Sequence, residues 1–84
     1  MKITFSQKAW EDYLDWQRLD KKKFKRINTL IKSISRTPFE GLGDPEPLKH
    51  DWSGYWSRRI DIKNRLVYRV TDNQIIIAQC KYHY

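Results

Sequence analysis

The second half of the chain alternates polar and apolar residues, and its turns are too short to join anything but antiparallel strands. This pattern predicts strands over residues 55–60, 65–70 and 74–82. The turns over 61–64 and 71–73 are rich in Asp, Asn and Thr and leave no room for a crossover connection. A further short strand is expected over 46–50, beside Pro47. We therefore expect an antiparallel meander.

Helical spacing dominates the first half. After a short strand over 2–5, Ser6 is a favourable N-cap for a helix that carries Glu11 and Asp12 near its positive end. The expected apolar face of this helix is Ala9, Trp10, Tyr13, Leu14 and Gln17. Asp20 is the expected cap of a second helix, whose apolar stripe is Phe24, Ile27, Leu30, Ile31 and Ile34. Pro38 ends that helix.

This order of elements predicts an α+β fold with a single domain over residues 1–84. The short link between the helices implies an antiparallel hairpin. We expect this two-helix hairpin to pack on one face of a twisted, mainly antiparallel sheet. The other face would be left partly open.

Composition limits the setting in which the protein works. The 84 residues include 32% charged side chains, and no stretch approaches the roughly 20 apolar residues of a membrane span. The N-terminal residues lack a secretory apolar region, and the single Cys80 cannot form an internal disulfide. We expect a cytoplasmic protein with no membrane association, in which Cys80 is a small buried residue.

The net charge of +7 is the strongest bulk signal of a partner. So basic a domain favours a polyanion, above all nucleic acid, or an acidic protein. The cations of the second helix are compatible with a solvated face or with a surface that follows phosphates. They are Lys21, Lys22, Lys23, Lys25, Arg26, Lys32 and Arg36.

Strand parity gathers several cations on the face away from the helices. Ser57 and Arg59 share a side in one strand, and Arg65, Val67 and Arg69 share a side in the next. The last strand is ambiguous, because both of its faces are apolar. If Ile76, Ala78 and Cys80 face the helices, Lys81 and His83 join the arginines. The end of the chain, 81–84, is otherwise compatible with an ordinary surface tail.

These residues would suit metal-free cleavage of RNA, which needs a base for the 2′-hydroxyl, cations for the phosphorane and an acid for the leaving oxygen. His83 is the candidate acid, and Arg65 and Arg59 are the candidate cations. Glu46 is the candidate base, since Pro45 and Pro47 restrict its backbone. Asp44, Glu40 and His50 are competing candidates for the base, and Glu46 is also compatible with an ordinary surface carboxylate. No spacing of Cys and His predicts a metal site, and no Gly-rich phosphate loop is present.

Four segments resemble the YoeB toxins, which belong to the RelE/ParE superfamily of bacterial type II toxin–antitoxin systems. They are 45–50 (PEPLKH), 56–60 (WSRRI), 65–68 (RLVY) and 82–84 (YHY). The likeness extends over essentially the whole chain. Residues 51–52 and 63–64 look less characteristic, but they lie in expected turns.

The resemblance implies an mRNA interferase with a microbial-ribonuclease-like fold. Such a toxin cuts mRNA in the ribosomal A site, without a metal or cofactor, and so inhibits translation. The resemblance implies Glu46 as the general base, His83 as the general acid and Arg65 as the transition-state cation. Lys49 and Arg59 would hold the phosphate, and Tyr84 would position the RNA. In an ideal strand Glu46 and Lys49 would point to opposite faces, so either the prolines bend the segment or Lys49 reaches the phosphate from the rim.

The resemblance also implies partners. These are ribosomal RNA beside the mRNA, a cognate antitoxin, operator DNA bound by the toxin–antitoxin complex, and a second toxin copy in a homodimer. The alternative function is a toxin without nuclease chemistry, either a basic nucleic-acid-binding module or a gyrase poison on the same scaffold.

Overall fold

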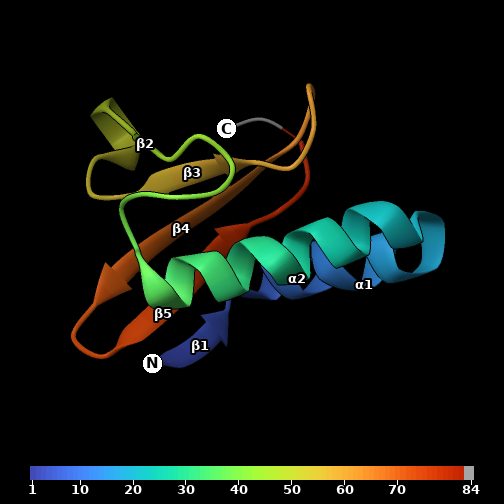
Figure 1. The fold of residues 1–84 in the computed structure, drawn as a ribbon, viewed down its shortest axis with the longest axis horizontal. Coiled ribbons are helices and arrows are strands. Elements are labelled where there is room, and N and C mark those ends of the chain that lie inside the picture. The colour runs from blue at the N-terminus through green and yellow to red at the C-terminus, as the bar shows by residue number, and fades with distance from the viewer. Residues whose placement is uncertain (83–84) are drawn as a thin grey trace.

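The computed structural model describes residues 1–82 and combines a helical hairpin with one sheet (Figure 1). In chain order the elements are β1 (Lys2–Phe5), α1 (Gln7–Leu19), α2 (Lys21–Arg36), β2 (Glu46–Pro47), the 3₁₀ turn η1 (His50–Trp52), β3 (Trp56–Arg59), β4 (Arg65–Thr71) and β5 (Gln74–Gln79). The predicted α+β class is confirmed. In this part of the chain neither helix has the length and apolar character needed to cross a bilayer.

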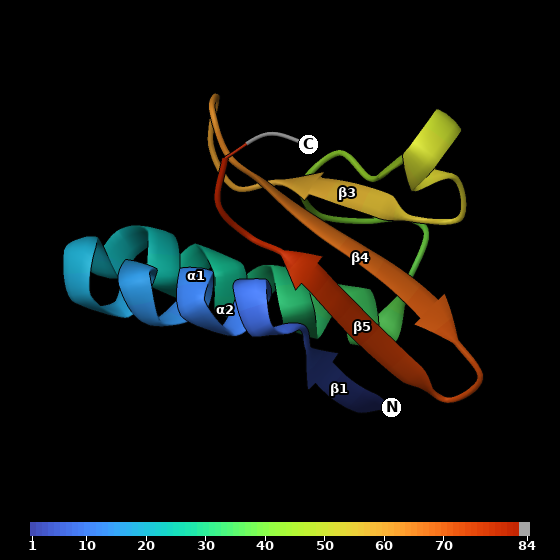
Figure 2. The same cartoon turned by 180° about the vertical axis from the view of Figure 1, so that it is seen from behind.

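The sheet has the strand order β1-β5-β4-β3-β2 and is mainly antiparallel. Among the strands of residues 1–82, only β1 runs parallel to its neighbour, β5, beside which it lies in Figure 2. The antiparallel meander predicted from the short turns is confirmed for β3, β4 and β5. The last strand, expected to reach residue 82, ends at Gln79.

The two predicted helix caps are confirmed. Ser6 Oγ accepts from the Ala9 N–H at 3.0 Å, and Asp20 Oδ1 accepts from the Lys22 and Lys23 N–H groups at 3.0 and 3.3 Å. These side chains satisfy backbone donors that a helix start leaves without partners.

The predicted apolar stripe of α2 is confirmed, whereas that of α1 is confirmed only in part: Ala9 is buried and Tyr13 packs against the core, but Trp10 and Leu14 do not belong to it. Ile27, Leu30, Ile31 and Ile34 of α2 are buried. The buried residues of α1 are Ala9, Asp12 and Trp16, and its Trp10 and Leu14 are 47% and 41% exposed. The reason is that α1 packs against the end of β5, where polar backbone groups of the strand need partners.

A bulge decides which face of β5 meets the helices. Ile75 and Ile77 are fully buried in the core, so of the two faces that the sequence left open, the one with Ile76 and Ala78 does not meet the helices. Val67 pairs with Gln79 while the next residue, Tyr68, pairs with Ile77, which leaves Ala78 as an extra residue in β5. The extra residue reverses the alternation, and Cys80 therefore joins the core as predicted.

The sheet face opposite the helices is less open than expected. Ser57 and Val67 at its centre are fully buried, and Arg65 is only 7% exposed. The loop after α2 folds along β3, where Gly43 O accepts from the Arg59 N–H at 2.7 Å. This loop therefore carries its residues directly to the candidate site.

Candidate functional site

Glu46 lies at the edge of the sheet, in the two-residue strand β2. It pairs with Ser57 of β3, and Pro47 pairs with Trp56. Proline lacks a backbone N–H and is tolerated at such an edge, where one side of the strand has no neighbour. The Glu46 side chain is exposed. The carboxylate is therefore accessible and is attached to a backbone that two prolines restrict.

Arg65 is held firmly beside Ser57, the cross-strand partner of Glu46. Its Nε donates to Ser57 Oγ at 2.8 Å, and its Nη2 donates to the Asp44 carbonyl oxygen at 3.1 Å. Neither of these acceptors carries a charge. The guanidinium thus has a fixed orientation, and these two bonds leave its positive charge without compensation.

Arg59 pairs directly with Arg65 across β3 and β4. It is 55% exposed along its side chain, and its Nη2 lies 3.7 Å from Asp44 Oδ2. Like charges placed opposite one another on a sheet repel each other, so an anion between them would relieve the repulsion. One guanidinium is fixed and the other is accessible, an arrangement suited to binding phosphate.

Lys49 lines a shallow hollow of about 460 Å³ that Glu46 and His50 also line. The strand expected over 46–50 ends at Pro47, and η1 begins at His50, whose φ is +56°. The strict alternation of an ideal strand therefore does not apply to Glu46 and Lys49. The bend explains how both residues border one depression.

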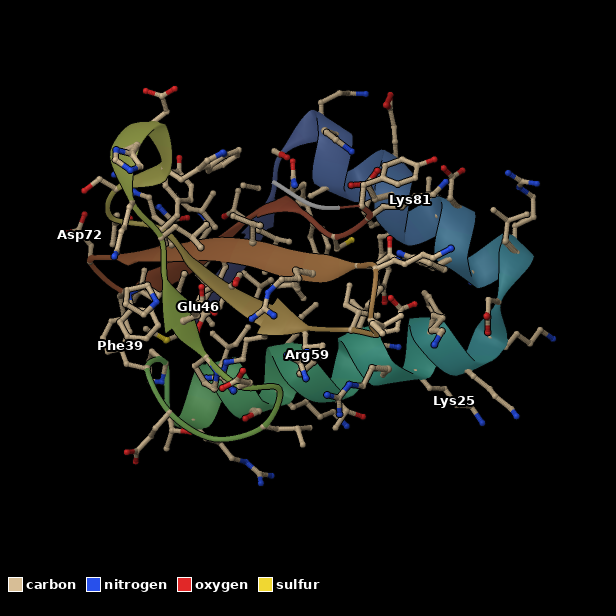
Figure 3. The ribbon with its side chains drawn as sticks, turned by 90° about the horizontal axis from the view of Figure 1, so that it is seen from above. Lys25, Phe39, Glu46, Arg59, Asp72 and Lys81 are labelled. Carbon is tan, nitrogen blue, oxygen red and sulfur yellow. The ribbon has the colours of Figure 1, made fainter. Side chains whose placement is uncertain are left out.

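The competitors for the role of base lie in different surroundings. Asp44 faces Arg59, as given above, and is 69% exposed. The backbone carbonyl oxygen of Glu40 accepts a hydrogen bond from Nη2 of the buried Arg58 at 2.9 Å. His50 shares the hollow with Glu46. Of the candidate residues, the structure brings Glu46, Arg59 and Arg65 onto adjoining segments, and Figure 3 shows Glu46 and Arg59. His83 and Tyr84 lie outside the described residues.

Lys81 does not join the arginines, contrary to the parity expectation. Its Nζ lies 3.1 Å from Asp15 Oδ2, and Figure 3 shows the side chain beside α1, away from Arg59. The hydrogen bond from Lys81 lowers the pKa of Asp15, and the same bond raises the pKa of Lys81. The β5 bulge and the early end of the strand remove the alternation on which the expectation rested.

Arg58 is a neighbour of the candidate site, and strand alternation puts it on the face opposite Ser57 and Arg59. It is fully buried and donates five hydrogen bonds, all to uncharged oxygens. The acceptors are Ser33 Oγ, Tyr68 Oη and the carbonyl oxygens of Thr37, Glu40 and Leu42. Tyr68 Oη in turn donates to Pro38 O at 2.6 Å. Arg58 therefore fastens the loop that leads to Asp44 and Glu46.

A signal for Arg58 was present in the sequence. Its parity groups it with Trp56 and Ile60, and a charged residue on an apolar strand face needs several partners. Burial raises the pKa of the Tyr68 phenol, although the nearby Arg58 charge opposes this effect. Residues 1–82 contain no group of three or more His, Cys, Asp or Glu side chains that could hold a metal ion.

Comparison with known proteins decides the family. Residues 5–84 match the model described as "YoeB-like toxin of bacterial type II toxin-antitoxin system". The chain belongs to this YoeB-like toxin family. Toxin YoeB of Escherichia coli K12 is 60% identical over 84 residues, which is the full length of both chains.

Solved structures of the family share the fold. A YoeB/ParE toxin from Agrobacterium tumefaciens is 49% identical with a TM-score of 0.98, over 100% of both chains. A YoeB dimer from Staphylococcus aureus is 56% identical with a TM-score of 0.93, over 100% of this chain and 98% of that one. The S. aureus toxin has also been solved as a YoeB–YefM complex, at 55% identity and a TM-score of 0.92 over the same shares. The predicted resemblance to the YoeB toxins is confirmed.

Proposed function

We propose that this toxin is a ribosome-dependent endoribonuclease that cuts mRNA in the ribosomal A site and so inhibits translation. The observation that carries the proposal is the connection from Glu46 through Ser57 to Arg65. The exposed carboxylate belongs to β2 and the fixed guanidinium to β4, and Ser57 of the intervening strand β3 contacts both residues. A base and a cation at this spacing suit attack by a 2′-hydroxyl on the neighbouring phosphorus.

In the proposed reaction Glu46 takes the proton of the 2′-hydroxyl, and the 2′-oxygen forms a bond to phosphorus. Arg65 stabilises the phosphorane, while Arg59 and Lys49 hold the phosphate oxygens. The bond from phosphorus to the 5′-oxygen breaks, and His83 donates the proton that this oxygen takes up. The products are a 2′,3′-cyclic phosphate and a 5′-hydroxyl. Tyr84 positions the RNA. No step of this reaction uses a metal or cofactor.

We further propose the partners of this reaction. The net charge of +7 favours ribosomal RNA and mRNA as polyanionic surfaces, and the reaction would take place in the cytoplasm, where ribosomes are. A relative from S. aureus forms a complex with YefM, and another structure of that toxin is a dimer. These support a cognate antitoxin and a homodimer for this chain, with operator DNA bound by the toxin–antitoxin complex.

The test is to add the protein to translating ribosomes that carry a defined mRNA and to map the new RNA ends. We expect cuts within the A-site codon, with Glu46→Gln and Arg65→Met each lowering the rate by at least about a hundredfold. Glu40→Gln and Asp44→Asn are matched carboxylate controls that should keep most of the activity. Removal of residues 83–84 should abolish cutting while the domain stays folded.

Each alternative has its own signature, either in this experiment or in cells that express the toxin. Equal cutting of free RNA and ribosome-bound RNA would rule out the ribosome requirement. Full activity of Glu46→Gln together with loss in Asp44→Asn would move the base to Asp44. Growth arrest with intact mRNA and damaged DNA would favour a gyrase poison instead.

A further inference from the structure

Helix α1 binds the chain at the point where β5 ends. Cys80 follows the last residue of β5, and both of its backbone polar groups are bound by side chains of α1. The Cys80 N–H donates to Asp12 Oδ2 at 3.0 Å, and Trp16 Nε1 donates to the Cys80 carbonyl oxygen at 2.7 Å. The next residue, Lys81, pairs with Asp15 of the same helix. Side chains of α1 thus replace the strand ladder beyond β5.

Burial of the Asp12 carboxylate costs more free energy than a purely structural contact would require. It is only 5% exposed, in a position where the stripe of a helix is normally apolar. Burial of a carboxylate costs free energy unless hydrogen bonds and an opposite charge compensate it. Lys8 supplies that charge, with its Nζ 2.9 Å and 3.0 Å from the two carboxylate oxygens. An apolar residue would fill the same space without this cost, but it would leave the Cys80 N–H without an acceptor.

The segment after Cys80 is bound from a second side by the turn between β3 and β4. The Tyr82 N–H donates to Asn64 Oδ1 at 2.6 Å, and the Arg65 N–H donates to the Tyr82 carbonyl oxygen at 3.2 Å. Tyr82 adopts a φ of +67°, which is uncommon for a residue with a side chain. The backbone of a candidate catalytic residue, Arg65, therefore contacts the residue that precedes His83 directly.

We propose that Asp12 and Trp16 are positioning residues that fix Cys80 and thereby set where His83 enters the site. The proposal rests on the proposed role of His83 as the acid. The clamp that Asp12 and Trp16 form on Cys80 lies three positions before His83, which makes a tether of at most about 11 Å of extended chain. A general acid must lie within hydrogen-bond reach of the leaving oxygen. A displacement of Cys80 would therefore also displace His83 relative to the RNA. A misplacement of a catalytic group by about 1 Å can lower the rate by up to about a hundredfold.

Conservative variants distinguish the effect of the two hydrogen bonds to Cys80 from the effect of general packing. Trp16→Phe removes the indole N–H and keeps an aromatic ring, and Asp12→Leu removes the acceptor and keeps a branched side chain. Asp12→Asn retains an oxygen that can accept from the Cys80 N–H, so it should rescue most of the activity. Trp10→Phe and Glu11→Gln are controls on the same helix, at exposed positions.

The first measurement is single-turnover and steady-state cutting of mRNA on programmed ribosomes. We expect Trp16→Phe and Asp12→Leu to lower kcat roughly tenfold or more and to leave KM within about twofold, because the tether affects proton transfer and not ribosome binding. In a His83→Gln background Trp16→Phe should add less than about a twofold loss, since residues that act through one group are not additive. An additional tenfold loss in that background would show that Trp16 acts elsewhere and would overturn the proposal.

The second measurement needs no RNA. Amide hydrogen exchange at Cys80 and Tyr82 should accelerate at least about tenfold in Asp12→Leu, while the central amides of α2 keep their protection. Unchanged exchange at Cys80, or wild-type kcat in both Trp16→Phe and Asp12→Leu, would overturn the proposal. A wild-type protein that leaves mRNA intact would overturn the proposed function, and the exchange experiment would still decide whether the clamp exists.

Discussion

Arg65 Nε donates to Ser57 Oγ at 2.8 Å, and this bond orients the guanidinium beside the strand that carries Glu46. Ser57 is fully buried, so water does not replace its hydroxyl easily. The serine thereby links the candidate cation to the cross-strand partner of the candidate base. Sequence parity placed Ser57 on this face without assigning it a role.

We expect Ser57→Ala to lower the rate of mRNA cutting about tenfold and to lower the free energy of unfolding by about 1–2 kcal/mol. The alanine removes the acceptor of a charged donor and leaves the guanidinium free to rotate. Cutting on programmed ribosomes and urea unfolding measure the two effects. Ser53→Ala, at an exposed position before β3, should change neither. Equal activity of Ser57→Ala and the wild type would contradict the orienting role of the serine.

Arg58 should be the most sensitive arginine for stability. Arg58→Met deprives four loop and helix acceptors and Tyr68 Oη of their donor, so we expect the free energy of unfolding to fall by about 3 kcal/mol or more. Arg58→Lys should also destabilise, because one ammonium cannot replace the planar fork of a guanidinium. Chemical denaturation measures both variants. Arg36→Met, at an exposed position of α2, should stay within about 0.5 kcal/mol of the wild type. A neutral Arg58→Met would show that the loop is held without this side chain.

A pair of glycines separates backbone strain from steric conflict. Gly43 and Gly54 have φ values of +88° and +93°, so alanine is strained at both positions. A Cβ at Gly43 would also lie 2.7 Å from Leu30 Cδ2, whereas a Cβ at Gly54 would meet nothing within 4 Å. We expect Gly54→Ala to cost about 1 kcal/mol and Gly43→Ala at least about twice as much in thermal unfolding. Gly43→Ala should also slow cutting, because Gly43 O accepts from the Arg59 N–H. Equal costs at the two positions would mean that the loop adjusts freely.

Cys80 should be inert in the folded protein. Burial and the nearby Asp12 charge raise the pKa of its thiol from 9.0 to about 12. At pH 8 an alkylating reagent should therefore label the thiol only after denaturation. As the pH rises above 9, the unfolded chain releases this proton before the folded protein does, so stability should fall between pH 9 and 12.

Cys80→Ala isolates the contribution of the thiol to this loss of stability at alkaline pH. The variant lacks the thiol, so its stability should decline less steeply over the alkaline range than that of the wild type. Tyr68, whose pKa is also raised, contributes equally in both proteins. Rapid labelling of native Cys80 at pH 8, or parallel stability curves for the two proteins, would contradict the assignment.

Much of the candidate site could be read from local patterns. Alternation in β3 and β4 predicts that Arg59 and Arg65 share a face, and their direct pairing confirms this. Alternation left the direction of the Lys49 side chain open, because β2 ends after two residues and the backbone turns into η1. It was wrong for Lys81, because a bulge and a pairing with Asp15 redirect the chain.

The sequence by itself determined the elements and their order. Ser6 and Asp20 start the two helices, and short polar turns allow only antiparallel neighbours, because caps and turns depend on residues that are close in the chain. Only the tertiary structure decided which face of β5 is buried, why Arg58 is inside, and why Asp12 faces the core. The first depends on the bulge in the pairing of β4 with β5, and the other two on the hydrogen-bond needs of backbone groups far away in the sequence. No local period reports which of those groups a fold will bury.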